Sequence, residues 1–316
     1  MGSARALSGC DSREPRTACD VTAPIGFAVI DKPAGLTSHA CVARIRRLLG
    51  IRRVGHGGTL DPAVTGVLPI AVGQATRLLP YLPGEKTYRG VIQLGITTSS
   101  DDLQGEVLSR QAGPVVSRAE LDGVLNRFRG AIRQRPPQVS AVHVDGERAH
   151  ARARRGEAMD LPERPVTIHH LHLLAWNPDL AQLSVEVHCT AGTYIRSLAR
   201  DLGEALGCGG CLASLRRTQA LGFRDDQAVP LPERPEQGGT GGMPLLRPEL
   251  ALPHLPQRTL TSREQNDWSC GRSLGPGSTE VASAVVVMSE NGRMLGLGLP
   301  DAERGIRPKV VFEAKG

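Results

Sequence analysis

Residues 55–70 read GHGGTLDPAVTGVLPI and place one carboxylate, that of Asp61, among four glycines and two prolines. Glycine lets a backbone pass close to a ligand, while proline stiffens a loop. The density of Gly, Pro and Thr predicts a loop rather than a regular element across 55–70. Because a lone Asp-Pro is most often a turn, these residue types alone favour a turn residue over a catalytic one at Asp61.

Regular elements are predicted on both sides of this stretch. Alternating apolar residues indicate strands, and apolar residues three and four apart indicate helices. Ser38 is the expected N-cap of the first helix, and Ser117 with Glu120 forms a capping box for the second. We expect strands at 26–31, 88–94, 106–108 and 183–189, helices at 38–50, 117–130 and 193–206, and a helical turn at 75–79.

The C-terminal part has a different pattern. Residues 226–247 are rich in Pro and Gly, which is typical of a linker. A short helix capped by Thr261 and Glu264 follows, then strands at 281–288, 294–299 and 308–312. The whole predicts an α+β protein with a mixed, mainly antiparallel sheet and a small β-rich C-terminal domain. We expect a disordered segment at 1–24, a main domain at 25–225, a linker at 226–247 and the small domain at 248–316.

Composition narrows the class of partner. The net charge of +6 and the pI near 9.2 mildly favour a polyanion. Aromatic residues are only 3%, which argues against a generic single-strand binder that stacks many bases. Two arginine clusters are either solvated helix faces or, as we favour, phosphate contacts: Arg44, Arg46, Arg47, Arg52 and Arg53, and Arg148, Arg152, Arg154 and Arg155.

No membrane segment or secretory signal is recognisable, so we expect a cytoplasmic protein without membrane contact. Seven cysteines at scattered spacing indicate reduced thiols. Cys208-Gly-Gly-Cys211 reads as a Gly-rich turn after a helix, since no second ligand pair completes a zinc site. In an alternating strand His170 and His172 share one face and His169 opposes them, so we expect no metal there. No heptad seam is present, which favours a monomer.

Residues 55–70 closely resemble the nucleophile motif of the bacterial TruB tRNA pseudouridine synthases. Four other landmarks of that family occur in the same order, so that the similarity covers about residues 25–225. The tail resembles, more weakly, a PUA-type RNA-binding domain. The further motifs are 31–38 (DKPAGLTS), 86–89 (KTYR), 192–196 (GTYIR) and 212–218 (LASLRRT).

The resemblance implies a fold of the pseudouridine-synthase type and roles for individual residues. Asp61 is the catalytic carboxylate, Arg196 its charge partner, and Tyr88 the ring that stacks on an extruded base. No cofactor and no metal are implied, because pseudouridine has the same atoms as uridine. Further substrate-binding residues implied by the motifs are His56, which helps to displace the base, Tyr194 and Leu215, which line the pocket, and Lys32 and Thr59.

The implied substrate is uridine 55 in the TΨC arm of tRNA, with no protein partner required. One stretch departs from the family pattern, because Val139, His143 and His150 stand where members often carry Tyr, Lys and Tyr. Two alternatives stay open: a non-catalytic helper of tRNA folding, and a guide-RNA-dependent relative in the dyskerin family.

Overall fold

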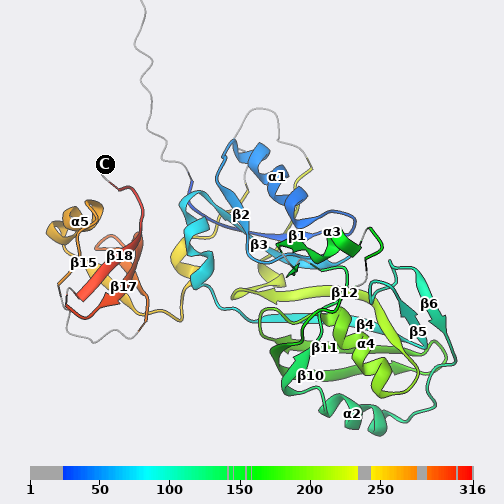
Figure 1. The fold of residues 1–316 in the computed structure, drawn as a ribbon. Helices are drawn as coiled ribbons and strands as arrows, with labels where there is room; N and C mark the ends of the chain where they lie inside the picture. Colours follow the sequence, from blue (N-terminus) through cyan, green and yellow to red (C-terminus); the bar gives the residue numbers. More distant parts are fainter. Residues whose placement is uncertain are drawn as a thin grey trace, which may run out of the picture.

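A computed structural model of the chain describes residues 24–140, 142–144, 146–153, 155–157, 159–233, 243–275, 283–303 and 305–314. Apart from Pro24, the segment expected to be disordered lies outside these residues. The larger part of the molecule is built on one sheet, and a smaller sheet stands at one end of it (Figure 1).

The large sheet has the strand order β14-β1-β3-β12-β4-β11-β10-β7, with β2 added to β3 and β13 added to β12. Two of its pairings, β1 with β14 and β3 with β12, are parallel and the others are antiparallel. The prediction of an α+β fold with a mixed, mainly antiparallel sheet is therefore confirmed. The strands are β1 (Gly26–Lys32), β2 (Val54–His56), β3 (Thr65–Val72), β4 (Lys86–Leu94), β7 (Gly130–Gln134), β10 (Arg164–Asn177), β11 (Gln182–Cys189), β12 (Gly210–Ala220), β13 (Phe223–Arg224) and β14 (Val229–Pro230).

The sheet has a core on each face, because side chains alternate along a strand. In β1, Ala28 and Ile30 join one apolar cluster, and Phe27 and Val29 join the other. The first cluster also contains buried residues of the three helices that cover that face. These helices are α1 (Ser38–Leu49), α2 (Arg118–Asn126) and α4 (Ile195–Ala205).

The starts of two helices were predicted correctly, whereas α4 begins at Ile195 and not at Thr193. Both capping boxes are present, Ser117 with Glu120 before α2 and Thr261 with Glu264 before α5 (Ser262–Ser269). The N-cap of α1, however, is Thr37 and not Ser38, since the Thr37 hydroxyl accepts the amide N–H of Ala40. The Ser38 side chain is thereby released for another contact. A 3-10 helix, η1 (Gly73–Tyr81), includes Pro80, where we had expected the turn to stop.

The small sheet has the order β15-β16-β17-β18 and is capped by α5. The small sheet packs against the face of the large sheet that carries the second apolar cluster. Val286, Met288 and Phe312 belong to that cluster together with Phe27 and Ala71. Its strands are β15 (Gln257–Leu260), β16 (Val285–Ser289), β17 (Met294–Asp301) and β18 (Gly305–Val311), and part of the predicted strand 281–288 lies outside the described residues.

The predicted linker 226–247 is only in part a linker. Val229 and Pro230 form β14, which pairs with Ile30 and Asp31 of β1. Farther on, Leu246 forms a bridge with Phe27. Both pieces add backbone hydrogen bonds to the exposed edge of β1, which explains why a Pro-rich stretch is ordered there. Residues 234–242 lie outside the described part.

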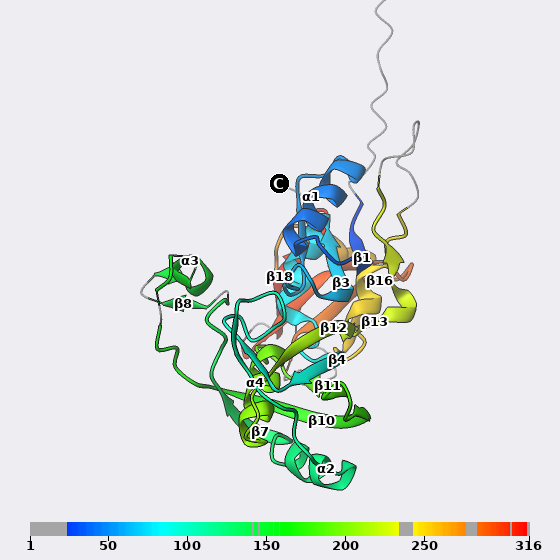
Figure 2. The same cartoon turned by 90° about the vertical axis from the view of Figure 1, so that its right-hand side faces the viewer.

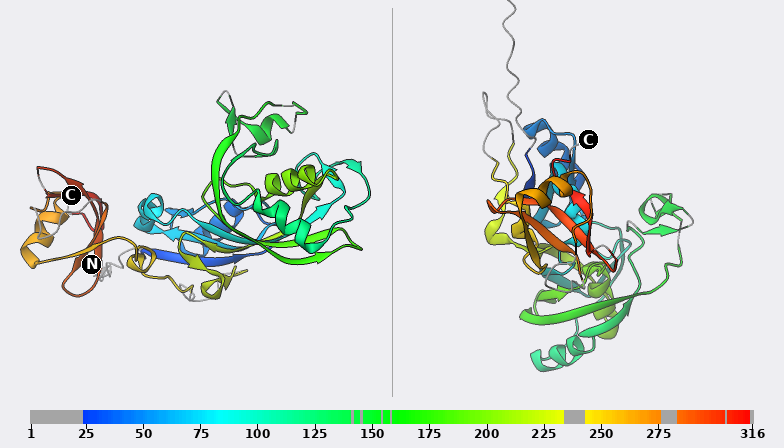
Figure 3. Two further views of the ribbon diagram at one scale, coloured as in Figure 1. Left: turned by 90° about the horizontal axis from the view of Figure 1, so that it is seen from below. Right: turned by 90° about the vertical axis from the view of Figure 1, so that its left-hand side faces the viewer.

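A segment between β7 and β10 projects from the sheet beyond α4 (Figures 2 and 3). It contains β8 (His143–Val144), β9 (Glu147–Arg148) and α3 (Ala149–Ala153). Its own small apolar cluster joins Val142, Ala149, Met159 and Leu161, with Tyr194 packed against them. We call residues 135–162 the projecting segment. Among the described residues, no helix has the length and apolar character needed to cross a membrane.

Candidate active site

Residues 55–70, which contain Asp61, form a loop only at their centre. Val54–His56 and Thr65–Val72 are strands, so that residues 57–64 alone lack regular structure. The prediction of a loop over 55–70 was wrong at both ends. The reason is that residues 67–72 are almost entirely apolar and buried between β1 and β12, as in a central strand.

The loop that carries Asp61 is held from below by two buried side chains. The Lys32 ammonium donates to the carbonyl oxygens of Pro62, Leu36 and Pro33 at 3.0, 2.7 and 2.8 Å. The Ser38 hydroxyl accepts the N–H of Leu60 at 2.8 Å and lies 3.2 Å from its carbonyl oxygen. Lys32 is fully buried and all three of its donors are used. Its geometry therefore favours a structural role, in which it holds the loop of Asp61, and not the substrate contact that the resemblance implied.

Asp61 points its carboxylate at a buried cation. Its Oδ2 lies 3.0 Å from Nη2 of Arg196, at the first turn of α4. The Asp61 side chain is 45% exposed, whereas that of Arg196 is 8% exposed. The guanidinium also donates to the carbonyl oxygens of Ser100 at 3.0 Å and Val139 at 2.9 Å. Arg196 is therefore fixed by the protein, and the carboxylate is the partner that faces outward.

Asp102 is a member of this site that the sequence did not reveal. Its Oδ2 lies 3.7 Å from Nε of Arg196. The other carboxylate oxygen accepts the Ser100 hydroxyl at 2.6 Å and the amide of Gln104 at 3.0 Å. Asp102 lies between the strands expected at 88–94 and 106–108, and nothing in the local sequence pattern relates this position to α4.

Tyr88 lies on β4 and is 7% exposed. Burial raises the pKa of its phenol to about 12, and the guanidinium of Arg217 opposes part of that rise. Tyr88 and Arg217 face each other in the register of β4 and β12. Arg217 is fully buried, and its position beside Tyr88 was not foreseen.

His56 ends β2, directly before the loop. Burial, followed by the charges of His39 and Arg217, lowers the pKa of its imidazole to about 4, so the ring is neutral near pH 7. The rings of His56 and His39 meet edge to face with centroids 5.1 Å apart. Nδ1 of His56 is buried and has no hydrogen-bond partner among the described residues.

The remaining predicted pocket residues are Tyr194, Leu215 and Thr59. Tyr194 precedes α4, and its backbone exchanges hydrogen bonds with the Gln134 amide at 2.7 and 3.0 Å. Leu215 is half-buried on β12, where it packs against Gly90; a Cβ there would lie 3.0 Å from Leu215 Cδ1. Thr59 is exposed on the loop. The side chains of Tyr194 and Asp61 also interact electrostatically.

The departures from the family pattern concern the projecting segment. Val139 contributes its backbone carbonyl to Arg196, and its side chain is 37% exposed. That contact does not depend on the side chain. The side chains of His143 and His150 lie outside the described part of the chain.

The two arginine clusters differ in the ion pairs that they form with carboxylates. In the first, around α1, no arginine forms an ion pair with a carboxylate of the described residues, and Arg47 and Arg52 are exposed. In the second, Arg155 binds Glu147 at 2.6 Å and Glu157 at 2.7 Å, and Arg152 binds Glu157 at 2.8 Å. The first cluster is thus the stronger source of positive potential.

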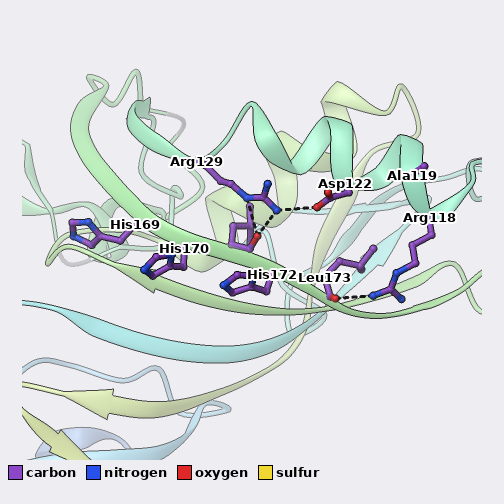
Figure 4. Close-up of a pocket in the computed structure, with 9 residues that line it drawn as sticks. Arg118, Ala119, Asp122, Arg129, His169, His170, His172 and Leu173 are labelled. Atoms are coloured by element: carbon purple, nitrogen blue, oxygen red, sulfur yellow. Dashed lines mark hydrogen bonds and ion pairs between the residues drawn. The ribbon is translucent and has the colours of Figure 1, made fainter.

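A cavity of about 810 Å³ lies away from Asp61, between α2 and the free edge of β10 (Figure 4). Arg129 and Arg118 donate there to the carbonyl oxygens of Leu171 and Leu173. Beside them the rings of His169 and His170 both approach His188, at centroid distances of 5.2 and 5.8 Å.

The prediction that His169 opposes His170 was therefore wrong. A register shift between Ile168 and His170 interrupts the alternation of side chains along β10, which a sequence pattern does not reveal. Within the described part of the chain, no group of three or more His, Cys, Asp or Glu side chains is arranged to hold a metal ion. The cysteines described there, including Cys208 and Cys211, are free thiols.

Comparisons with known proteins agree with the geometry. A sequence model described as TruB family pseudouridylate synthase (N terminal domain) matches residues 46–195. A second, described as tRNA pseudouridylate synthase B C-terminal domain, matches residues 196–233. The chain is 77% identical over 300 residues to the tRNA pseudouridine synthase B of Synechococcus sp. (strain WH7803), covering 94% of this chain and 100% of that protein. It is 56% identical over 320 residues to that of Prochlorococcus marinus (strain MIT 9313), with coverage of 94% and 100%.

Solved structures with a similar fold include chains of two larger complexes. One is a chain of an H/ACA RNP bound to a substrate RNA containing 2′-deoxyuridine, with a TM-score of 0.66 and 25% identity over 91% of this chain and 84% of that one. Another is a chain of a Cbf5-Nop10-Gar1 complex, with a TM-score of 0.65 and 26% identity over 90% and 83%.

Proposed function

Since this chain belongs to the TruB family of tRNA pseudouridine synthases, and is therefore an isomerase acting on tRNA, we propose that it converts uridine 55 of the T loop with Asp61 as the catalytic carboxylate. The proposal concerns the position of the uridine, the flipping of its base and the residues that act. It rests above all on one observation, the contact between the outward-facing Asp61 carboxylate and the buried Arg196 guanidinium.

The reaction breaks the bond from N1 to C1′, turns the uracil over and joins C5 to C1′. The hydrogen on C5 leaves and N1 gains one, so that no atom is gained or lost overall. An ionised carboxylate is the group that such a reaction needs, as a nucleophile or as a stabiliser of the electron-poor sugar. The neighbouring guanidinium of Arg196 contacts the Asp61 carboxylate at 3.0 Å and fixes its orientation.

The target base must leave the RNA stack before the carboxylate can reach its sugar. Flipping costs a few kcal/mol, and stacking on one ring returns about 1–3 kcal/mol. We assign this ring to Tyr88, which is 7% exposed and interacts electrostatically with Asp61. His56, neutral near pH 7, and the side chains of Tyr194 and Leu215 complete the proposed pocket.

Contacts to the phosphates of the T arm are assigned to the first arginine cluster. Its cations are not neutralised by carboxylates of the described residues. We further propose that residues 25–225 are the catalytic domain, and that the small sheet within 248–316 is a PUA-like unit that adds RNA contacts. The apolar packing of that unit on the large sheet supports a fixed distance between the two RNA-binding parts.

The test is the substitution Asp61→Asn, which keeps the shape of the side chain and removes its charge. We expect no pseudouridine in tRNA labelled with tritium at uridine C5, read as tritium release, and binding of tRNA within about tenfold of wild type. The matched control is Asp179→Asn, an exposed aspartate of the turn between β10 and β11. Turnover by the Asp61 variant would overturn the assignment, and a wild-type chain that binds tRNA without forming pseudouridine would favour a tRNA-folding helper.

A guide-RNA-dependent reaction is the second candidate, because one solved structure of this fold is a chain of an H/ACA RNP bound to a substrate RNA. The purified chain should modify a bare stem-loop of the T arm at the position of uridine 55. Carbodiimide mapping of the product gives the position. Modification only after addition of a guide RNA would favour the second candidate.

A further inference from the structure

Arg217 is a buried cation that pairs with no carboxylate of the described residues. Its side chain has no exposed surface. Nε donates to the Val67 carbonyl at 2.8 Å and Nη2 to the Gly58 carbonyl at 3.1 Å, while Nη1 has no acceptor among the described residues. Taking a guanidinium out of water and leaving one of its donors unpaired costs several kcal/mol, which calls for an explanation.

The guanidinium touches one of the proposed active-site residues. Arg217 is opposite Tyr88 in the pairing of β12 with β4, and the guanidinium lies beside the phenol. The charge of Arg217 opposes the rise in the pKa of Tyr88, and the phenol likewise opposes the fall in the pKa of Arg217. Tyr88 is the titratable group that acts on Arg217, and no carboxylate does.

The same guanidinium touches the loop of Asp61. Gly58 stands three residues before Asp61 and has a φ of +108°, and its carbonyl is an acceptor for Arg217. A Cβ at Gly58 would lie 3.6 Å from Arg217 Nη1 and 3.6 Å from Lys86 Nζ, which are ordinary contact distances. The unpaired Nη1 is therefore enclosed between the loop, Lys86 and the region of Tyr88.

From these contacts we propose that Arg217 is a positioning residue for the isomerisation, which joins the loop of Asp61 to the side of Tyr88 and holds that phenol in place with the cation beside it. The inference rests on the proposed function. Arg217 has no exposed surface and so does not touch the RNA. Its effect on the reaction passes through the Tyr88 hydroxyl group, which separates it from a residue that only stabilises the fold.

The first experiment is a double-mutant cycle. Arg217→Lys keeps a charge but lacks the planar fork that reaches two carbonyls and a phenol. We expect its single-turnover rate to fall about 10- to 100-fold, because small displacements of reacting groups are costly, while the Kd for tRNA changes less than about threefold. In a Tyr88→Phe background the same substitution should lower the remaining rate less than about twofold.

The matched control is Arg216→Lys, the neighbouring arginine, which is 39% exposed and pairs with Asp31 at 2.9 Å. We expect this variant to keep its rate within about twofold. An equal loss of rate for Arg217→Lys with Tyr or Phe at position 88 would overturn the inference. So would a loss of tRNA affinity as large as the loss of rate.

A second readout needs no turnover. With a fluorinated tyrosine at position 88, the ¹⁹F resonance follows ionisation of the phenol in the folded protein. Arg217→Met should raise the pKa of this phenol, since a neighbouring cation is lost, and Arg217→Lys should raise it less. An unchanged pKa in both variants would refute the contact. If the wild-type chain does not modify tRNA at all, the proposed function fails; if it does and Arg217→Lys is equally active, only this inference fails.

Discussion

The Asp61 carboxylate and the Arg196 guanidinium are 3.0 Å apart, yet one side chain is 45% exposed and the other only 8%. Such a pair is asymmetric, because the buried partner is fixed by the protein and the exposed one is available to a ligand. Arg196 gains its position from backbone carbonyls of the loop before β6 (Val107–Arg110) and of the projecting segment. Movement of either element would therefore shift the Arg196 side chain and, with it, the position of the Asp61 carboxylate.

We predict that Arg196→Lys slows catalysis much more than it weakens folding. Lysine keeps the charge but has one nitrogen in place of the planar fork whose Nη1 reaches Ser100 and whose Nη2 reaches Val139 and Asp61. The single-turnover rate should fall about 100-fold, with tRNA binding within about threefold. The control is Arg200→Lys, one turn later on α4, which pairs with Asp101 and Asp201 instead. A rate for the Arg196 variant within twofold of wild type would contradict the prediction.

The pKa of His56 leads to a prediction about acid stability. The unfolded chain takes up a proton at this imidazole near pH 6.5, whereas the folded chain does so only near pH 4. The unfolded state thus binds more protons in this window, and the free energy of unfolding falls as the pH is lowered from 6.5 to 4. Above pH 6.5 the group has no such effect.

Urea unfolding at several pH values between 7 and 4.5 measures this linkage. The variant His56→Gln cannot take up the proton. The slope of its free energy of unfolding against pH should therefore be smaller than that of wild type, by the equivalent of up to one bound proton. At pH 7.5 the difference in unfolding free energy between the variant and wild type measures only the packing that is lost with the imidazole. Identical slopes for the two proteins between pH 6 and 4.5 would mean that His56 is protonated in the folded state.

How much the sequence reveals depends on the range of the interaction. The capping boxes at Ser117 and Thr261 were predicted correctly, because all of their atoms come from four consecutive residues. The α+β class followed from the order of the elements. At α1, Thr37 and Ser38 are both good caps, and the choice is made by Leu60, which binds the Ser38 hydroxyl from the other side of the site.

The residues that the sequence did not reveal act across the sheet. Asp102 and Arg217 reach their partners from elements about 95 and 130 positions away in the chain. No periodicity relates such positions. The register of β4 and β12 brings Arg217 to Tyr88, and the position of α4 brings Arg196 to Asp102. The Asp61–Arg196 pair is equally distant in sequence, and it was expected only because the motifs resemble a known family. Its catalytic role stays a prediction.

A glycine in β3 provides a test of the packing beneath the site. Gly66 has a φ of +101°, and a Cβ there would lie 2.2 Å from the carbonyl oxygen of Arg217. Gly66→Ala should therefore cost about 2 kcal/mol or more of unfolding free energy, measured by urea melts. Gly123→Ala is the control: this helical glycine has open space and should gain about 0.5–1 kcal/mol. Equal stability of the Gly66 variant and wild type would show that β12 shifts freely.

The arginines around α1 differ from those of the projecting segment in their pairing, and this difference should appear in the salt dependence of tRNA binding. Each phosphate contact adds about 0.9 to the slope of log K against log salt. Arg47→Gln with Arg52→Gln should lower that slope by up to about 2, measured by filter binding. Arg155→Gln should change it little, because Glu147 and Glu157 already neutralise that cation. An unchanged slope for the double variant, or a larger change for Arg155→Gln, would move the phosphate contacts to the projecting segment.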